Sequence, residues 1–408
     1  MSSLAIHGGT PVRTKPFPPR HPFGDREVEL VTQAIRSQNL FGPSGTMVPE
    51  LERRFAQLYG VEHAVAYTSG TAAIHVALGA LNPEPGDEII TAPITDAGTV
   101  APILFQNCIP VFADIDDTFN LDPRDVEAKI TPRTRAIIAV HLFGNPCDMD
   151  AMTAVARRHG VALIEDCCQA HLTSYRGKLC GTMGGVGCFS LQQSKHMTCG
   201  DGGLTITRQP ELAERMALFR DKGWPRRHGA RDYVLLGLNY RMTELQGAVA
   251  LAQLDKVADV VRRRNELGDS LTALLRDAPG VLPAPVTPGG RHTYWLYGLR
   301  VTGADPARFA EALRAEGIPC GQGYIGKPIY LCMEALAQAR TFGSSSHPLD
   351  GCHGGRRVEY APGMCPRTEE ILGQMITVGI HEQMAPEDVE DIATAVQKVA
   401  RGAARPGF

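Results

Sequence analysis

The sequence lacks the features of membrane-embedded, secreted and nucleic-acid-binding proteins. In 408 residues, 43% of them hydrophobic and 21% charged, no apolar run approaches the roughly 18 residues of a membrane-spanning helix. The first residues contain no basic segment followed by an apolar stretch, so no secretory signal is expected. The formal net charge of -3 argues against a polyanion as the main partner. We therefore expect a cytoplasmic protein that binds neither membrane nor nucleic acid.

A disulfide or zinc framework is also missing. The 11 cysteines are odd in number and have no regular spacing, which is typical of reduced thiols. Cys167 and Cys168 are adjacent, and Cys352 precedes His353 in a Gly-rich loop. A zinc site needs two ligand pairs at defined spacing, so we expect no metal site.

The chain is too long for one compact domain, and its first half alternates short apolar strands with helices. Residues 1–24 are rich in Pro, Gly and Arg and are expected to form an arm. Expected helices cover residues 25–38, 49–59, 72–81, 100–106, 123–128 and 149–159, and expected strands cover residues 64–68, 88–92, 111–114, 135–140 and 162–165. Units of this kind, each closing in about 30 residues, predict a mostly parallel sheet covered by helices on both faces.

The second half predicts a smaller α+β domain. A long helix over residues 243 to about 275 is expected to span both domains, with Arg262-Arg263-Arg264 on its solvated face. Expected strands lie at residues 204–207, 293–301 and near Val378, and expected helices at residues 210–220, 306–316 and 386–399. Residues 341–363 are rich in Gly and Ser, and a loop that is mobile or forms part of the mouth of a site is favoured over a packed segment.

Lys195 is the first candidate for catalysis. It lies in a polar turn between a strand-like segment that includes Phe189 and the glycines Gly200, Gly202 and Gly203. An ε-amine held away from water loses its proton more easily and becomes a nucleophile that can form a Schiff base. The alternative is an ordinary solvated loop lysine.

Two further segments are candidates for the same site, because ligands of parallel sheets bind outside the carboxyl ends of the strands. Thr68-Ser69-Gly70-Thr71-Ala72-Ala73 ends a strand and opens a helix with small residues, so the first free N–H groups of that helix could bind a phosphate. An ordinary helix cap explains the same residues. Asp166 follows the strand at residues 162–165 and could pair with a pyridinium nitrogen, with Gln169 near the phenolic oxygen; a carboxylate capping the next helix is the alternative.

A phosphate cup, a carboxylate and a lysine in this order resemble the pyridoxal-phosphate (PLP) site of a fold-type-I aminotransferase. The chain resembles the sugar and cyclitol aminotransferases of the DegT/StrS family over nearly its whole length. The matching stretches are Gly8-Gly9-Thr10-Pro11-Val12-Arg13, Thr68-Ser69-Gly70-Thr71-Ala72-Ala73, Thr131-Pro132-Arg133-Thr134, Val140-His141-Leu142-Phe143-Gly144, Glu165-Asp166-Cys167-Cys168-Gln169-Ala170-His171, residues 190–203 and Asn239-Tyr240-Arg241-Met242.

The resemblance implies a fold and roles for single residues. The fold is α/β, PLP fold type I, with an N-terminal arm (residues 1–24), a large PLP-binding domain (25–265) built on a mostly parallel central sheet, and a small C-terminal α+β domain (266–408). Lys195 matches the Schiff-base lysine, Asp166 the pyridinium partner and Gln169 the residue near the phenolic oxygen. The phosphate ligands match Gly70, Thr71 and Ser190, and Asn239 matches an asparagine that reaches the phosphate of the neighbouring subunit in a homodimer with shared active sites.

Candidate substrate contacts are Arg241, Arg13 and Tyr324. Arg241 could hold the carboxylate of the amino donor, although an internal pair with Glu244 at helical spacing explains it equally well. Acceptor contacts are expected from Arg13 and the arm, and from the loops at residues 41–45, 222–231 and 321–327. One departure from the family concerns Asp96, which stands among the expected cofactor-binding residues where relatives place an aromatic ring that stacks on the cofactor.

The resemblance implies a two-step amino transfer from glutamine or glutamate to a keto-sugar or keto-cyclitol, in the biosynthesis of aminosugars or aminocyclitols such as those of aminoglycoside antibiotics. Lys195 would serve as general base and acid. Asp96 keeps a second hypothesis open, namely another PLP reaction such as dehydration, epimerisation or elimination. A sensor that only binds the cofactor would need an added DNA-binding module, for which neither the length nor the charge leaves room.

Overall fold

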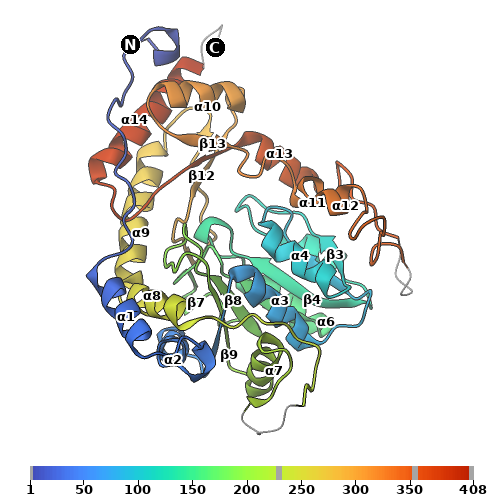
Figure 1. Ribbon diagram of the computed structural model, residues 1–408. Helices are drawn as coiled ribbons and strands as arrows, with labels where there is room; N and C mark the ends of the chain where they lie inside the picture. The colour runs from blue at the N-terminus through green and yellow to red at the C-terminus, as the bar shows by residue number, and fades with distance from the viewer. Residues whose placement is uncertain (1–2, 227–231, 352–356, 404–408) are drawn as a thin grey trace.

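The computed structural model describes residues 3–226, 232–351 and 357–403 (Figure 1). Its main sheet has the strand order β1-β9-β8-β5-β4-β2-β3. Four neighbouring pairs, from β8 to β3, are parallel, and β9 runs antiparallel to both β1 and β8. The strands are β1 (His63–Tyr67), β2 (Glu88–Thr91), β3 (Ile109–Phe112), β4 (Thr134–Val140), β5 (Ala162–Asp166), β8 (Val186–Ser190) and β9 (Gly203–Thr207). The predicted α/β class and mostly parallel sheet are confirmed.

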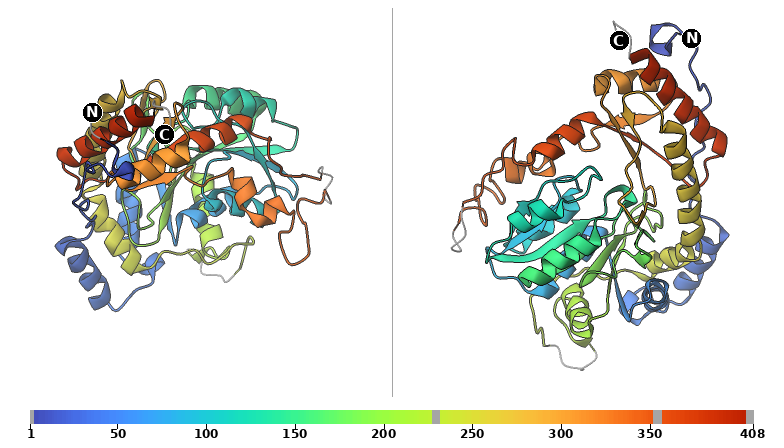
Figure 2. Two further views of the ribbon diagram at one scale, coloured as in Figure 1. Left: turned by 90° about the horizontal axis from the view of Figure 1, so that it is seen from above. Right: turned by 180° about the vertical axis from the view of Figure 1, so that it is seen from behind.

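Helices cover this sheet on both faces (Figures 1 and 2). They are α1 (Asp25–Arg36), α2 (Met47–Tyr59), α3 (Gly70–Leu81), α4 (Ala97–Phe105), α5 (Pro123–Ala128), α6 (Met149–His159), α7 (Pro210–Arg220) and α8 (Glu244–Leu254). Most of these bounds agree with the sequence prediction to within three residues.

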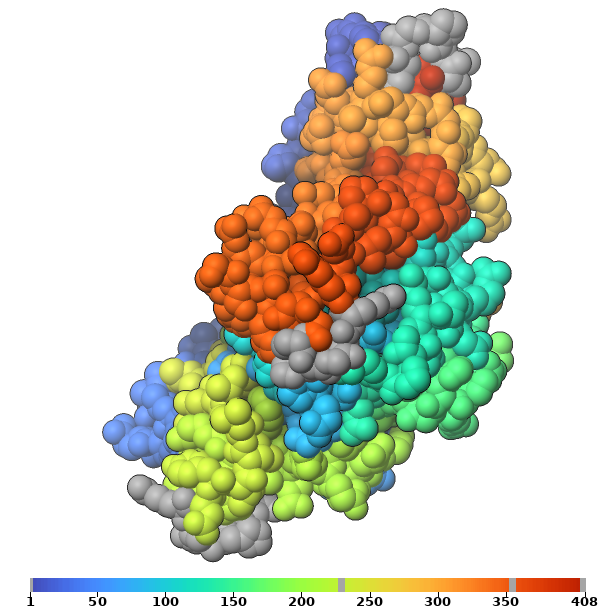
Figure 3. Space-filling model, turned by 90° about the vertical axis from the view of Figure 1, so that its right-hand side faces the viewer, coloured from blue at the N-terminus to red at the C-terminus, as the bar shows by residue number. Residues whose placement is uncertain are grey.

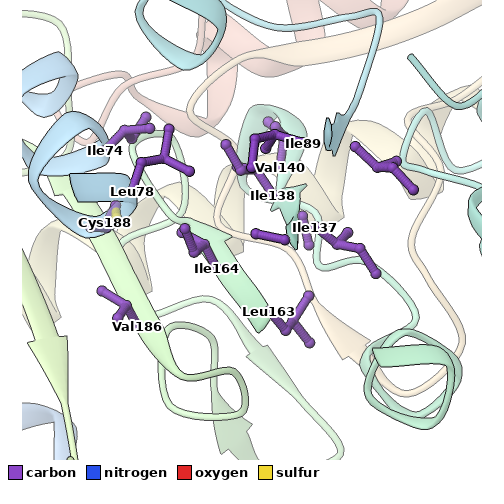
Figure 4. Close-up of a cluster of buried hydrophobic side chains, with 14 of the residues drawn as sticks. Ile74, Leu78, Ile89, Ile137, Ile138, Val140, Leu163, Ile164, Val186 and Cys188 are labelled. Carbon is purple, nitrogen blue, oxygen red and sulfur yellow. The ribbon is translucent and has the colours of Figure 1, made fainter. Parts of the chain in front are cut away.

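The central strands are buried because nearly every side chain on them is apolar. In β4 the run from Ala136 to Val140 is almost fully buried, as expected of a strand covered on both faces. Ile138, Ile164 and Val186 on neighbouring strands pack with Ile74 and Leu78 of α3 (Figure 4). This packing fixes the start of α3 against the carboxyl ends of the strands, which is where the site forms.

A second cluster covers the antiparallel end of the sheet. Phe189 on β8 packs against Phe55 and Tyr59 of α2, with ring centroids 5.1 and 4.8 Å away. Residues of α1 and α8 complete this cluster. Because Phe189 is fully buried, the strand that leads into the Lys195 turn has a fixed direction.

The small domain is built on an antiparallel sheet with the order β10-β12-β14-β13. Its strands are β10 (Val281–Leu282), β12 (Tyr297–Val301), β13 (Cys320–Gln322) and β14 (Met375–Val378), and its helices are α9 (Val257–Leu275), α10 (Pro306–Ala315), α13 (Pro366–Gln374) and α14 (Pro386–Ala403). The short helices α11 (Ile329–Cys332) and α12 (Glu334–Ala337) pack against α4 and β3 of the large domain. A small third sheet joins β6 (Ser174–Tyr175), β7 (Lys178–Leu179) and β11 (Gly290–Arg291). The N-terminal arm begins beside α14 and descends to α1, so it touches both domains (Figure 1).

The long helix expected over residues 243–275 is in fact two helices, α8 and α9. Helix α8 packs in the core of the large domain, whereas Leu267 and Leu271 of α9 pack in the core of the small domain. The chain must therefore change direction between them. At this junction the Lys256 ammonium donates a 2.6 Å hydrogen bond to the Pro22 carbonyl and pairs with Glu27. The domain boundary at residue 265 stays a prediction, since α9 runs across it.

Two further expectations about the second half were wrong. Arg264 does not lie on a solvated face but is buried beside Glu382. Parts of the Gly/Ser-rich segment at residues 341–363 pack firmly, because Leu349 and Tyr360 are buried against Phe112 and the Tyr360 hydroxyl donates to the Pro110 carbonyl. Leu349 and Tyr360 thus pack against β3, the edge strand of the main sheet, and Figure 3 shows the orange surface of this part of the chain beside the cyan surface of the large domain. Cys352 and His353 lie outside the described residues.

No described helix combines the length and apolar character needed to cross a membrane.

The start of α2 depends on one buried carboxylate. Glu244 accepts hydrogen bonds from the backbone N–H groups of Thr46, Met47 and Val48 at 2.7, 2.8 and 2.9 Å. A negative charge is favourable there, because these groups form the positive end of the helix dipole. Glu244 thus joins α8 to α2.

We expect Glu244→Gln to lower the free energy of unfolding by about 2–4 kcal/mol, because the amide loses the charge and turns donors toward N–H groups. Urea unfolding measures this loss. The control is Glu211→Gln, at the exposed first turn of α7, for which we expect a change within about 0.5 kcal/mol. Equal losses in the two variants would contradict the role of Glu244.

Candidate active site

A cavity of about 340 Å³ lies where β5 and β8 end and where α3 and α4 begin. Its described lining consists of Ser69, Gly70, Thr71, Ile74, Thr95, Asp96, Gly98, Thr99, Val140, Asp166, Cys168, Gln169, Ser190, Gln192, Ser194, Lys195, Asp201 and Trp295. The structure therefore brings together seven residues that the sequence singled out, which are Gly70, Thr71, Asp96, Asp166, Gln169, Ser190 and Lys195. The position agrees with the rule for ligands of parallel sheets.

Lys195 lies in the turn that follows β8, and its amine lies in the cavity wall. The Nζ atom is 3.7 Å from the centroid of the Trp295 ring. Burial lowers the pKa of Lys195, although the nearby groups of Cys168, Asp166 and Asp96 act in the opposite direction. The amine thus loses its proton more readily than a solvated lysine, as a nucleophile or a base requires.

Asp166 ends β5 and is almost fully buried. Its Oδ2 accepts a hydrogen bond from the Thr99 hydroxyl at 2.8 Å, and its Oδ1 accepts one from the Cys168 N–H at 3.0 Å. Among the described residues, Asp166 forms no salt bridge. A buried carboxylate held only by neutral donors favours a cationic partner, so this residue suits a ligand that presents a protonated nitrogen.

The start of α3 forms a cup with free N–H groups. The Ser69 side chain caps the helix by accepting from the Ala72 N–H at 3.1 Å, which leaves the N–H groups of Gly70 and Thr71 at the cavity wall. A Cβ on Gly70 would lie 2.7 Å from the Ser190 Cβ, so the close approach of α3 to β8 requires glycine at position 70. Such a helix start is suited to bind an anion.

Gln169 is held by two partners. Its Oε1 accepts from the Phe143 N–H at 2.8 Å, and its Nε2 donates to the Tyr324 hydroxyl at 3.2 Å. The Tyr324 ring also packs edge-on against Phe143 and Trp295. Burial raises the pKa of Tyr324 to about 12, so this phenol stays protonated. Tyr324 is not part of the described lining of the cavity, but it contacts the lining residues Gln169 and Trp295.

Asp96 has a local role that the sequence analysis did not foresee. It is the N-cap of α4, and its Oδ1 accepts from the Gly98 N–H at 2.7 Å. The residue is exposed on the cavity side. Its carboxylate thus stabilises the helix whose Thr99 contacts Asp166, while its charge acts on Lys195.

Arg13 lies outside the cavity, contrary to its expected role as a substrate contact. Its guanidinium pairs with Asp388 and Asp391 of α14, at 2.7 and 2.8 Å, and lies over the Phe17 ring. The arm docks on the small domain at this point. Arginine bridges two carboxylates well because its donors are spread over a planar fork, so the side chain is committed to this contact.

Arg241 does not pair with Glu244 as considered above. It pairs with Asp221, which Arg226 also contacts, and it lies over the Phe41 ring. Burial by itself would raise the pKa of Asp221, but the two arginines outweigh it and hold this pKa below its ordinary value. Arg241 is absent from the described lining of the cavity.

Asn239 and the described residues of two loops expected at the acceptor, 41–45 and 222–226, are also absent from the described lining of the cavity. Asn239 is exposed in the segment between α7 and α8. Gly42 and Pro43 border a separate cavity of about 640 Å³ together with residues 224–226. Residues 227–231 of the basic loop lie outside the described residues.

A buried group of possible metal ligands lies beneath the site. Nitrogen, oxygen and sulfur atoms of His141, Glu165 and Cys167 lie within 4.8 Å of one another. However, Glu165 already accepts from His141 and from the N–H groups of Gly181, Met183 and Gly184. The carboxylate therefore acts as a structural anchor for the loop before β8.

Sequence reasoning missed Thr99 and Trp295. Thr99 could have been found, because it lies in the first turn of α4, three residues after the candidate Asp96. Trp295 was assigned to a strand over residues 293–301, whereas β12 begins only at Tyr297. Trp295 precedes β12, and its backbone N–H donates a hydrogen bond to the Phe143 carbonyl. Because Phe143 is distant in the sequence, no local pattern indicates this contact.

Comparisons with known proteins agree with this geometry. The model of the DegT/DnrJ/EryC1/StrS aminotransferase family matches residues 23–347. The chain is 36% identical to the L-glutamine:2-deoxy-scyllo-inosose aminotransferase of Streptomyces kanamyceticus, over 98% of this chain and 97% of the relative. It is 40% identical to the GDP-perosamine synthase of Caulobacter vibrioides, over 63% of this chain and 70% of the relative.

Solved structures extend the likeness to three dimensions. The crystal structure of DesV from S. venezuelae in complex with a ketimine intermediate superposes with a TM-score of 0.81 and 29% identity, covering 92% of this chain and 94% of DesV. The match extends over most of the chain, as expected of fold type I. The chain belongs to the DegT/DnrJ/EryC1/StrS aminotransferase family and is a pyridoxal-phosphate-dependent aminotransferase.

Proposed function

We propose that this enzyme transfers an amino group from L-glutamine to the ketone of a cyclitol, in the biosynthesis of an aminocyclitol. The relative from S. kanamyceticus, similar over nearly the full length of both chains, supports this substrate pair. The observation that carries the proposal is the meeting of Lys195, Asp166 and the start of α3 in one cavity.

The residues present fit the cofactor. Free N–H groups at the start of α3 and the Ser190 hydroxyl suit its phosphate, and Asp166 suits its ring nitrogen. When bound, the cofactor supplies an electron sink and carries the amino group from donor to acceptor. Lys195 would hold it covalently and move a proton as base and then as acid, which a buried amine with a lowered pKa can do.

The charge of the cavity favours an uncharged acceptor. Within the described lining, Lys195 is the one cationic side chain, against the three carboxylates Asp96, Asp166 and Asp201. A nucleotide-linked sugar needs basic groups for its diphosphate. A polyhydroxylated ring without charge needs hydroxyl and amide partners, which Gln192 and Ser194 offer in the described lining.

The purified enzyme should show the visible absorbance of a lysine-bound cofactor, and L-glutamine should convert it to the spectrum of pyridoxamine phosphate. Lys195→Ala should lack the first band, because the amine that forms the bond is gone. The converted enzyme should return to the first spectrum with 2-deoxy-scyllo-inosose and not with a nucleotide-linked keto-sugar. A band that no amino donor converts would contradict the transaminase role, and a reversed acceptor preference would contradict the cyclitol.

Asp96→Asn should shift the pH dependence of cofactor attachment to apo-enzyme. The Asp96 carboxylate raises the pKa of Lys195, so its removal lowers that pKa and increases the deprotonated fraction of Lys195 at a given pH. The rise in attachment rate with pH, followed by visible absorbance, should then begin at lower pH. Asparagine retains the cap of α4, and Asp201→Asn is the control, since Asp201 lines the cavity without raising this pKa. No shift, or equal shifts in both variants, would contradict this role of Asp96.

The proposed active form is a homodimer in which Asn239 completes the site of the neighbouring subunit. Asn239 is exposed and is absent from the described lining of the cavity in its own subunit. The preceding residues Tyr233, Val234, Leu236 and Leu238 expose large apolar side chains, with Leu236 93% exposed. Several exposed large apolar side chains in one short segment support an interface there.

Mixed dimers test this arrangement. Asn239→Ala should weaken cofactor binding about tenfold or more, as expected for a lost hydrogen bond to a charged group. A dimer with one Lys195→Ala subunit and one Asn239→Ala subunit should recover about half the wild-type activity, because one of its two sites then has both residues intact. Separately tagged subunits allow its purification. Activity no higher than the parent variants would show that Asn239 does not act across the interface.

A further inference from the structure

The turn that carries Lys195 has little regular structure of its own. Within residues 192–196, the Lys195 N–H donates to the Gln192 carbonyl at 2.9 Å, and the Ser194 N–H donates to the Gln192 side chain at 2.8 Å. Its outward carbonyl groups depend on other parts of the chain. The Trp295 ring N–H donates to the Ser194 carbonyl at 3.0 Å. The position of Lys195 is therefore set by side chains from outside the turn.

Arg20 of the N-terminal arm supplies the other contacts. Its Nη1 donates to the Gln193 carbonyl at 3.1 Å and its Nη2 to the His196 carbonyl at 3.2 Å. These two carbonyls flank Lys195 on both sides in the sequence. The third nitrogen, Nε, donates to Glu382 at 2.8 Å. One guanidinium thus joins the lysine turn to the segment between β14 and α14.

Arg20 is itself held firmly. Glu382 lies between Arg20 and the buried Arg264 of α9, whose Nε is 2.9 Å from the other carboxylate oxygen. The arm backbone is fixed on both sides of Arg20, since His381 contacts the Pro18 carbonyl and Gln383 contacts both backbone groups of His21. A side chain with so little freedom can impose a geometry on the turn that it contacts.

We propose that Arg20 is a positioning residue for Lys195, which holds the turn so that the amine meets the cofactor. This inference rests on the proposed role of Lys195 and not on the identity of donor or acceptor. Arginine is required because three different partners bind its three nitrogens, whereas the ammonium of a lysine is a single point. Loss of Arg20 should leave the cavity in place and make the approach of the Lys195 amine less accurate.

Two cofactor forms separate positioning from simple damage. Pyridoxal phosphate bonds to Lys195 with loss of water, whereas pyridoxamine phosphate occupies a site without that bond. In Arg20→Met we expect covalent attachment to apo-enzyme to be at least about tenfold slower, with a weaker visible circular dichroism band, because a small misplacement of a reacting group has large kinetic effects. The dissociation constant of pyridoxamine phosphate should stay within about twofold of wild type.

Arg13→Met is the matched control, because Arg13 anchors the same arm but contacts none of residues 192–196. It should attach the cofactor at the wild-type rate. Arg20→Lys keeps the charge beside Glu382 and should fold even if Arg20→Met does not, yet attach the cofactor slowly. The inference is overturned if both Arg20 variants attach it normally, if Arg13→Met is equally slow, or if pyridoxamine phosphate binding falls in parallel. Absence of attachment in the wild type would instead overturn the role of Lys195.

Discussion

The site depends on one constraint. The amine of Lys195 must lie near the buried carboxylate of Asp166 without forming an ion pair that would keep the amine protonated. Lys195 and Asp166 line the same cavity, and no ion pair joins them among the described residues. The Thr99 hydroxyl and the Cys168 N–H instead donate one hydrogen bond to each oxygen of Asp166, and these neutral donors leave its negative charge uncompensated. The carboxylate thereby remains available for a cation that arrives with the ligand. A direct pair would have favoured the protonated lysine and removed its nucleophilicity.

Sequence patterns predicted the helices and strands that are determined by residues close together in the chain. Helix α6 was predicted to the residue, because its capping aspartate and its apolar spacing are contiguous in the chain. The cavity residues could be grouped in advance because parallel strands end at one edge of a sheet. Arg13, Arg241 and Arg264 could not be placed, because their partners Asp388, Asp221 and Glu382 are distant in sequence. Charge alone does not indicate which carboxylate an arginine will meet.

Asp96 illustrates how one position can serve two elements. An aromatic ring at this position could stack on a cofactor but could not accept the Gly98 N–H that begins α4. A Cβ on Gly98 would approach the Thr71 hydroxyl to 2.4 Å, so α3 and α4 start in close contact. With aspartate in place of the aromatic residue, this position stabilises the start of α4 and does not stack on the cofactor. Because Thr99 of α4 donates to Asp166, the cap also helps to fix the position of Asp166.

The electrostatics of the cavity set a limit on how a phosphate can bind. Each described lining aspartate repels a dianion, and Lys195 is needed for the bond to the cofactor. Positive potential must then come from backbone N–H groups, which carry partial charge without a titratable proton. The start of α3 provides these N–H groups without burying another cationic side chain. Because the start of α3 contributes no cationic side chain that could pair with Asp166, this carboxylate stays free for the ring nitrogen. The types of residue in the lining therefore assign the two parts of the cofactor to different groups. The backbone dipoles at the start of α3 suit the phosphate, and the charge of Asp166 suits the ring nitrogen.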